Sequence, residues 1–331
     1  MDTSKISSSW PYRVAYFPLE YADETLGSLI ARYADRTNSP TPESAMRSLA
    51  RGILRNDGRF DTWTRLFIRT LEEDAWLNAV GILQDTTMLP YVSAFWSKER
   101  RARFTASLRA SQDARHDPIL DAWLLFGIRD SSLNWCPECA HEEDRASEEP
   151  RWHRSHQLPW MERCPKHGCD LQRGLVLGGL SLPLSSFVDD LGDRLPLKRT
   201  ACCQTTRSMD NLALWSLQIL DGVRGPFNLD ELRPIYRECL ARTHPEFLVP
   251  QADIQTSFDD LVHRTIGRDA YARTRANGPH AGWIRFFRWI WGQRDIKLPE
   301  CTELHLWFWA TCWIDPATLP GSCFPQHRCS S

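Results

Sequence analysis

Two short turns near the middle of the chain constrain its folding more than any other feature. The first, CPEC, runs from Cys136 to Cys139, and the second, CPKH, runs from Cys164 to His167, with 24 residues between them. Two donors separated by two residues can reach one ion from a tight turn. Three thiolates and one imidazole suit a tetrahedral zinc ion. The spacing therefore predicts one zinc site made of Cys136, Cys139, Cys164 and His167.

Several neighbouring side chains could replace one member of this set. They are His141, His153, His156 and Cys169, and Cys169 is the strongest competitor because it follows His167 by two positions. A set of four protein donors is coordinatively closed, so it stabilises structure and leaves no position for a reactive water. A zinc hydrolase or deaminase would also need an open coordination position and a carboxylate acting as general acid or base, and the chain has no H-x-E…P-C-x-x-C signature of the deaminase type. We therefore expect no enzymatic activity.

Cysteine usage and hydropathy indicate a reducing compartment and no membrane span. The eleven cysteines are odd in number and none precedes Cys136, which is unlike a disulfide framework. The polar start, Met1 to Trp10, lacks the apolar core of a signal peptide. The apolar stretch from Leu304 to Ile314 is far shorter than the roughly 20 residues that a transmembrane helix needs. These features favour the bacterial cytoplasm.

The beginning of the chain has the pattern of paired helices. After Asp23, apolar residues recur at i, i+3, i+4 and i+7 from Leu26 to Tyr33, which is one face of a helix. A polar turn follows, and Thr41 before a proline is a typical start for a second helix, which would run to Leu54. The pair is either a DNA-binding helix-turn-helix or an ordinary helical hairpin.

Helical periodicity resumes after the cysteine segment. It is found in residues 212–220, 232–240, 283–291 and 304–314. The sequence therefore predicts a mainly α fold with a central zinc finger or ribbon. The predicted parts are a helical, helix-turn-helix-like N-terminal domain over residues 1–130, a zinc-finger module with a connecting segment over 131–205, and a C-terminal helical domain over 206–331.

The charge balance restricts contacts with polyanions to local patches. The chain has 40 Lys and Arg against 42 Asp and Glu, a formal net charge of −2. Residues 98–115 hold six basic and two acidic side chains, and residues 268–297 hold seven basic and two acidic ones interleaved with aromatics. Such patches could bind phosphates or a partner protein, or they could be a solvated arginine face over a tryptophan-rich core. The candidate contact residues are Arg100, Arg101, Arg103, Arg268, Arg273, Arg275, Arg285 and Arg288.

Three blocks of the sequence resemble the TniQ/TnsD family. The string CPECAHEEDRASEEPRWHRSHQLPWMERCPKHGCDL, from Cys136 to Leu171, closely resembles the family's zinc-finger signature, including the W-x-R-x-x-Q-L-P stretch that begins at Trp152. The segment from Pro18 to Asn38 is similar to the family's start. Trp283-Ile284-Arg285 is similar to its Trp-Leu-Arg near the end.

This resemblance implies a target-selection protein of a multi-component DNA transposon. Such a protein recognises a landing site and recruits an AAA+ transposition regulator. Some members act as a dimer on an RNA-guided Cascade complex, and this shorter, CRISPR-associated kind suits 331 residues. Members of the TnsD kind instead bind an attachment sequence directly, and that is the alternative. Because the family's second zinc finger is represented here only by Cys169 and the adjacent Cys202 and Cys203, we expect one zinc ion and no second.

Overall fold

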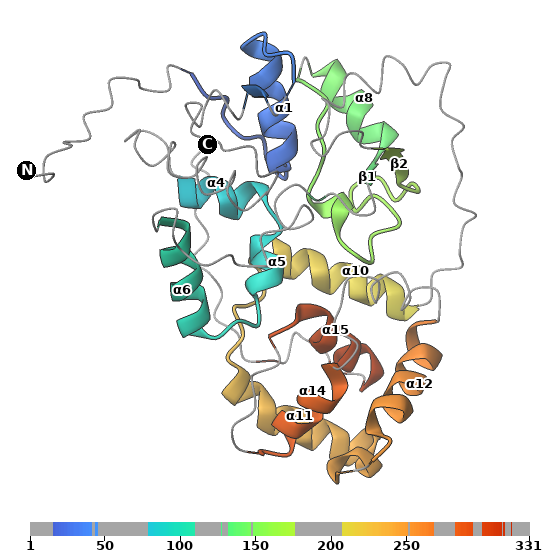
Figure 1. Ribbon diagram of the computed structural model, residues 1–331. Helices are drawn as coiled ribbons and strands as arrows, with labels where there is room; N and C mark the ends of the chain where they lie inside the picture. Colours follow the sequence, from blue (N-terminus) through green and yellow to red (C-terminus); the bar gives the residue numbers. More distant parts are fainter. Residues whose placement is uncertain are drawn as a thin grey trace, which may run out of the picture.

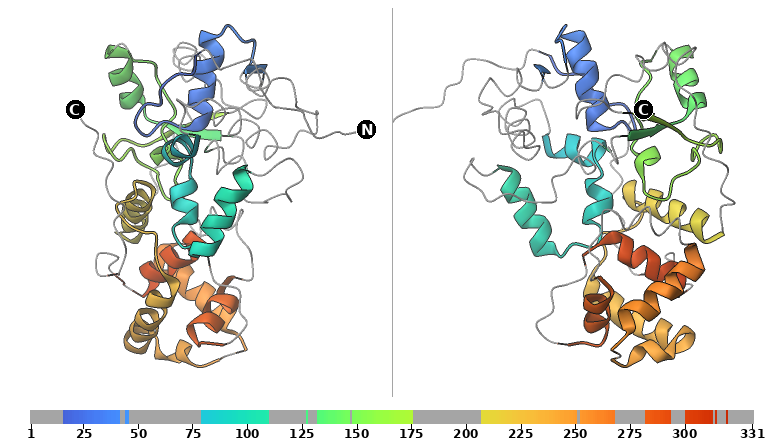
Figure 2. Two further views of the ribbon diagram at one scale, coloured as in Figure 1. Left: turned by 90° about the vertical axis from the view of Figure 1, so that its left-hand side faces the viewer. Right: turned by 45° about the vertical axis from the view of Figure 1, so that its right-hand side comes forward.

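The computed structural model describes residues 16–41, 44–45, 79–109, 127, 132–146, 148–175, 207–250, 252–267, 282–293, 300–312, 314 and 319. These residues are mainly helical, with a two-stranded antiparallel sheet, as the sequence predicts for the fold class. Figure 1 shows helix α1 and the cysteine-containing module side by side at one end of the molecule. The C-terminal helices form the other end, and helices α5 and α10 lie between the two (Figures 1 and 2).

The elements have the following bounds. The helices are α1 (Leu26–Arg36), α4 (Ala79–Thr86), α5 (Leu89–Ser93), α6 (Lys98–Arg109), α8 (Pro137–Arg145), α10 (Arg207–Leu220), α11 (Leu229–Thr243), α12 (Ile254–Ile266), α14 (Gly282–Ile290) and α15 (Thr302–Thr311). The strands are β1 (Ser132–Trp135) and β2 (Gln172–Leu175), and short 3-10 turns occupy Ser155–Gln157 and Pro245–Leu248. No helix among the residues that the structure describes is long and apolar enough to cross a membrane.

Helix α1 is the first predicted helix, and it begins at Leu26, where the apolar pattern also begins. The Thr25 side chain caps it by accepting a hydrogen bond from the backbone N–H of Ser28 at 3.2 Å. Asp23 and Glu24 lie outside the helix because they pair with the segment around His153. The helix is buried from Leu26 to Ala34, which is more of its surface than a single apolar stripe would cover.

The second helix of the predicted pair lies mostly outside the described residues. At its start, Thr41 accepts a hydrogen bond from the backbone N–H of Ser44 at 3.0 Å, as a helix cap would. Residues 44 and 45 are helical, and residues 46–54 are outside the described part of the chain. The helix-turn-helix therefore stays a prediction.

The C-terminal helices enclose an aromatic core. The four predicted segments correspond to α10, α11, α14 and α15, and α12 is a further helix with buried Ile254, Phe258, Val262 and Ile266 at four-residue spacing. Phe258 packs edge-on against Trp283 and Phe287, with ring centroids 4.5 and 4.9 Å apart. The aromatic side chains of α14 and α15 therefore belong to the buried core. Most of the tryptophans in the described residues are buried as well.

Contacts cross the predicted domain boundaries. The backbone N–H of Phe227 donates to the carbonyl of Ala94 at 2.8 Å, and the hydroxyl of Thr302 donates to the carbonyl of Tyr91 at 2.7 Å. Buried side chains also form one cluster that includes the cysteine module and the C-terminal helices. These contacts show that the described segments on either side of residues 130 and 205 share one core. They do not test whether domain boundaries lie at those two residues, which stay a prediction.

Candidate metal centre

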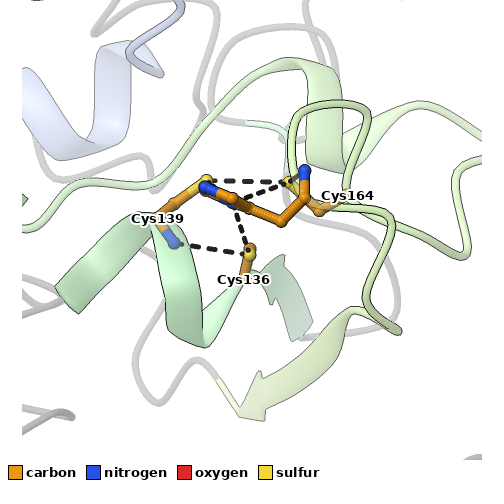
Figure 3. Close-up of side chains that lie close together, drawn as sticks. Cys136, Cys139 and Cys164 are labelled. Carbon is orange, nitrogen blue, oxygen red and sulfur yellow. Dashed lines mark hydrogen bonds between the residues drawn. The ribbon is translucent and has the colours of Figure 1, made fainter. Parts of the chain in front are cut away.

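Strand β1 and helix α8 position the first pair of donors. Cys136 follows β1 and is the N-cap residue of α8, and its Sγ accepts a hydrogen bond from the backbone N–H of Cys139 at 3.4 Å. The second pair lies in the turn before β2, and β2 pairs with β1 so that Trp135 is opposite Gln172. Figure 3 shows Cys136 and Cys139 at the start of α8, with Cys164 facing them from the opposite loop. The short sheet thus brings the two turns together.

The four predicted donors converge on one point. Their ligand atoms, in Cys136, Cys139, Cys164 and His167, all lie within 4.8 Å of one another. His167 Nδ1 is 3.4, 3.3 and 3.5 Å from the three sulfurs in that order, and the sulfurs of Cys139 and Cys164 are 3.6 Å apart. Tetrahedral zinc bonds imply edges of about 3.6 Å between sulfur and nitrogen and about 3.8 Å between sulfurs. The cluster therefore has the size of a zinc site and could hold a metal ion.

The electrostatics of the sulfurs also suit a cation. Burial raises the pKa of the Cys136 thiol to about 12, and burial together with the neighbouring sulfurs raises the pKa of Cys139 further. Burial disfavours the Cys164 thiolate too, but hydrogen bonds from His156 and from backbone N–H groups outweigh it and lower the pKa to about 5. Three buried thiolates repel one another, so a divalent cation among them would stabilise the charged forms that bind it.

Glu142 supports His167 from outside the cluster. His167 Nε2 donates to Glu142 Oε1 at 3.0 Å, and the other carboxylate oxygen of Glu142 pairs with Lys166. The hydrogen bonds from Lys166 and His167 lower the pKa of Glu142 to about 2. A carboxylate on the far nitrogen of a ligating histidine is typical of metal sites. Sequence reasoning missed Glu142, although it follows Cys139 by three residues and so lies on the same side of α8.

The other residues considered as donors have different environments. His141 is exposed, and His153 lies between Asp23 and Glu143. His156 is buried beside Cys164, and Cys169 Sγ is 3.3 Å from Cys136 Sγ. No second group of donors occurs in the described part of the chain, and Cys202 and Cys203 lie outside it.

The segment between the two turns clamps the module to helix α1. The backbone N–H of Thr25 donates to the carbonyl of Trp152 at 2.8 Å, and the N–H of Arg154 donates to the carbonyl of Asp23 at 2.7 Å. Asp23 also accepts hydrogen bonds from the backbone and the hydroxyl of Ser155. These contacts join residues about 130 positions apart, so α1 and the metal module are packed as one unit.

Two arginines in the segments that resemble the TniQ/TnsD family, Arg32 and Arg154, form hydrogen bonds inside the fold. Arg32 donates to both carboxylate oxygens of Glu24, at 2.9 and 2.7 Å, and to the carbonyl of Leu19 at 2.7 Å. Arg154 donates to the carbonyls of Gln84 and Thr87, which ties the module to α4. Both guanidinium groups are buried and used inside the fold.

The predicted contact arginines fall into three groups. Arg100 pairs with Glu300 and stacks on Trp96, and Arg101 donates to the carbonyl of Trp96 at 2.5 Å. Arg103, Arg285 and Arg288 are exposed on α6 and α14. Arg268, Arg273 and Arg275 lie outside the described residues.

The fold and the site define the class: a mainly helical protein with a Cys3His cluster in the middle of the chain that could hold a metal ion. Residues 15–171 match the TniQ family model, and this part of the chain belongs to the TniQ family. Membership implies a transposition-associated role, as an adaptor or DNA-binding protein. The match begins at the described segment before α1 and ends just after the metal cluster. No curated protein matches the chain significantly.

Proposed function

We propose that this protein is a non-catalytic target-selection adaptor of a multi-component DNA transposon. It links an RNA-guided Cascade complex to an AAA+ transposition regulator, acts as a homodimer and works in the bacterial cytoplasm. The observation that carries the proposal is the TniQ match over residues 15–171, which includes α1 and the two cysteine turns that pack beside it. Rigid packing of this kind suits a scaffold that holds two partners at a fixed distance.

The metal in this proposal is one zinc ion bound by Cys136, Cys139, Cys164 and His167. Zinc would supply folding energy by replacing repulsion among thiolates with four bonds. All four positions are filled by protein donors, which supports a structural role over hydrolysis, the remote alternative. We expect close to one zinc per chain, and loss of it in Cys136→Ser and Cys164→Ser but not in Cys301→Ser. Full zinc content in the first two variants would rule out the assignment.

Nucleic-acid or partner contacts are proposed for the arginine set, with Arg103, Arg285 and Arg288 as its most accessible members. Their side chains are exposed. Arg285 and Arg288 are separated by three residues, so they lie on one face of α14. The ion pair of Arg100 and the backbone bond of Arg101 make those two less available. The three arginines between α12 and α14 complete the proposed set.

The alternative function is direct reading of an attachment site, as in the TnsD kind. The recognition element would then be the helix pair within residues 23–54 or the segment 253–291. Gel shifts with attachment-site and random duplexes over a salt series separate this from the adaptor role. Tight, sequence-selective binding by the isolated protein would favour the DNA reader and overturn the adaptor proposal.

The adaptor role is tested by co-purification with tagged Cascade and, separately, with the AAA+ regulator. Light scattering of the same preparation should give twice the chain mass of 38.3 kDa. The double change Arg285→Glu with Arg288→Glu should weaken retention of one partner. Charge reversal at Arg145, an exposed arginine of α8, serves as the control. Failure of the unmodified protein to retain either partner would exclude the role.

A further inference from the structure

A fifth potential donor lies beside the four that form the proposed zinc site. Cys136, Cys139 and Cys164 are buried and fixed by the first turn and the loop opposite it. Two more donors, His167 and Cys169, are half-buried at the rim of the cluster. Their atoms approach the same sulfur: His167 Nδ1 is 3.4 Å and Cys169 Sγ is 3.3 Å from Cys136 Sγ. A tetrahedral ion accepts four of these five.

The backbone keeps both rim donors within reach of the site. The turn is closed by the N–H of Gly168, which donates to the carbonyl of Cys164, and by the N–H of Cys164, which donates to the carbonyl of Cys169, both at 2.8 Å. Gly168 has φ +68, a conformation that a residue without a Cβ adopts without strain. Exchange of one rim donor for the other therefore requires side-chain movement around this turn and no unfolding of it.

One contact distinguishes the two donors. Glu142 Oε1 accepts from His167 Nε2 at 3.0 Å, so the other ring nitrogen, Nδ1, carries the lone pair that faces the sulfurs. Lys166 holds the second oxygen of the same carboxylate and so fixes its orientation. This arrangement orients the imidazole for metal binding before the ion arrives.

We propose that Glu142 selects His167 over Cys169 as the fourth ligand, and that Cys169 is a reserve donor which completes the site when His167 is not held. In that exchange His167 Nδ1 would leave the donor set, and the Cys169 thiol would lose its proton to solvent and supply Sγ in its place. Glu142 is a positioning residue, because it acts through His167 without touching the ion. The inference rests on the proposed zinc site.

Cobalt loading of the full-length protein tests the choice, because the thiolate-to-cobalt charge-transfer absorption grows with the number of bound thiolates. The unmodified protein should give a three-thiolate spectrum, and Glu142→Ala should give a four-thiolate spectrum. Glu142→Ala with Cys169→Ser should return to three thiolates with about 10- to 100-fold weaker binding. Glu138→Ala is the matched control, since Glu138 is exposed on the same helix and precedes Cys139.

The outcomes separate this inference from the zinc assignment itself. If the unmodified protein binds no cobalt or zinc, the site proposal fails. If it binds metal but Glu142→Ala matches Glu138→Ala in spectrum and affinity, the selecting role of Glu142 is rejected. As a second measurement, His167→Ala should bind through four thiolates. If it instead matches the His167→Ala, Cys169→Ser double variant, the reserve role of Cys169 is rejected.

Discussion

At the scale of single residues, the buried ion pair of Arg32 and Glu24 holds the segment before α1 against the helix. Their side chains are 5% and 0% exposed, and two hydrogen bonds join them in the planar geometry that arginine and a carboxylate favour. Tyr21 lies between the guanidinium groups of Arg32 and Arg151, which are 4.3 and 4.4 Å from its ring centroid. Loss of either charge would leave the other poorly compensated in a buried environment.

We therefore expect Glu24→Ala to lower the free energy of unfolding by about 3–5 kcal/mol. Urea unfolding followed by tryptophan fluorescence measures the change. Arg36→Ala is the control, because Arg36 makes a solvent-exposed pair with Glu149, worth about 1 kcal/mol or less. Equal effects of the two substitutions would contradict the assigned role of burial.

His153 links α1 to the metal module through charge. Its ring is 2.7 Å from a Glu143 oxygen and 3.4 Å from an Asp23 oxygen. Burial disfavours the imidazolium, but the hydrogen bonds with Asp23 and Glu143 outweigh this and raise the pKa of His153 from 6.5 to about 9. Because the folded pKa exceeds the unfolded one, the stabilisation is fully present below pH 6.5 and is lost as the pH rises through about 9.

The free energy of unfolding should fall on the order of 3 kcal/mol between pH 6.5 and 9 from this group. His153→Gln should be less stable at pH 6.5 and should show a flatter profile over the same range. The measurement is urea unfolding at half-unit pH steps with the metal retained. His141→Gln, a change at an exposed position, should keep the original slope. An unchanged slope in His153→Gln would refute the linkage.

At the scale of elements, the Gln157 side chain binds backbone groups of strand β1 that a further strand would otherwise pair with. Its side-chain oxygen accepts from the backbone N–H of Asn134 at 2.8 Å, and its amide nitrogen donates to the carbonyls of Asn134 and His153 at 2.7 and 2.8 Å. The N–H and the carbonyl of Asn134 in β1 are thereby both satisfied by one side chain, on the edge of β1 that faces away from β2. Gly127 fits beside it with φ +73, where an added Cβ would be 2.6 Å from the Gln157 side chain.

Gln157→Ala should destabilise the protein by about 1–3 kcal/mol, because partly buried backbone groups of Asn134 and His153 would lose their partners. Thermal unfolding of the metal-loaded protein gives the difference. Gln84→Ala makes the same substitution at an exposed position of α4 and should have little effect. A melting temperature for Gln157→Ala equal to that of Gln84→Ala would contradict the role of Gln157 in the sheet.

The elements that sequence reasoning found are those with local patterns. Helix α1 has a sustained apolar face, and the two turns of the metal cluster carry their donors within four residues each. Strands β1 and β2 were missed because each has four residues and its partner lies about 40 positions away. The sequence also could not distinguish an arginine that forms an ion pair inside the fold from one that is free to contact a partner, since the carboxylate that pairs with Arg100 is 200 residues away.

The candidate site was predictable in its donors and less so in their surroundings. Spacing alone brings Cys136, Cys139, Cys164 and His167 together, because each pair occupies one turn. The contacts of Glu142 and Cys169 depend on side-chain rotamers and on the turn at Gly168, for which the sequence has no periodic signal. Sequence patterns therefore specify what converges, and packing determines how the converging groups are oriented.

At the scale of the whole molecule, the metal module and the C-terminal helices share one core. Trp160, which follows the W-x-R-x-x-Q-L-P stretch, packs edge-on against Trp307 of α15 with ring centroids 6.1 Å apart. Cys136, Cys139 and Cys164 belong to the same buried cluster as α15. Because interiors are close-packed, a change at the metal site should propagate into that helix.

Removing the metal should consequently loosen more than the module. With a zinc chelator, we expect amide hydrogen exchange to accelerate in α8 and also in α15, which Trp160 contacts directly, and to accelerate less in α11, whose Tyr236 packs against α14 and α15. Hydrogen exchange read by mass spectrometry resolves these helices, and adding zinc back should restore protection. Trp160→Ala should uncouple them, so that chelation accelerates exchange in α8 alone. Acceleration confined to residues 132–175 in the unmodified protein would mean that the shared core transmits nothing, and the cluster would then stabilise only its own module.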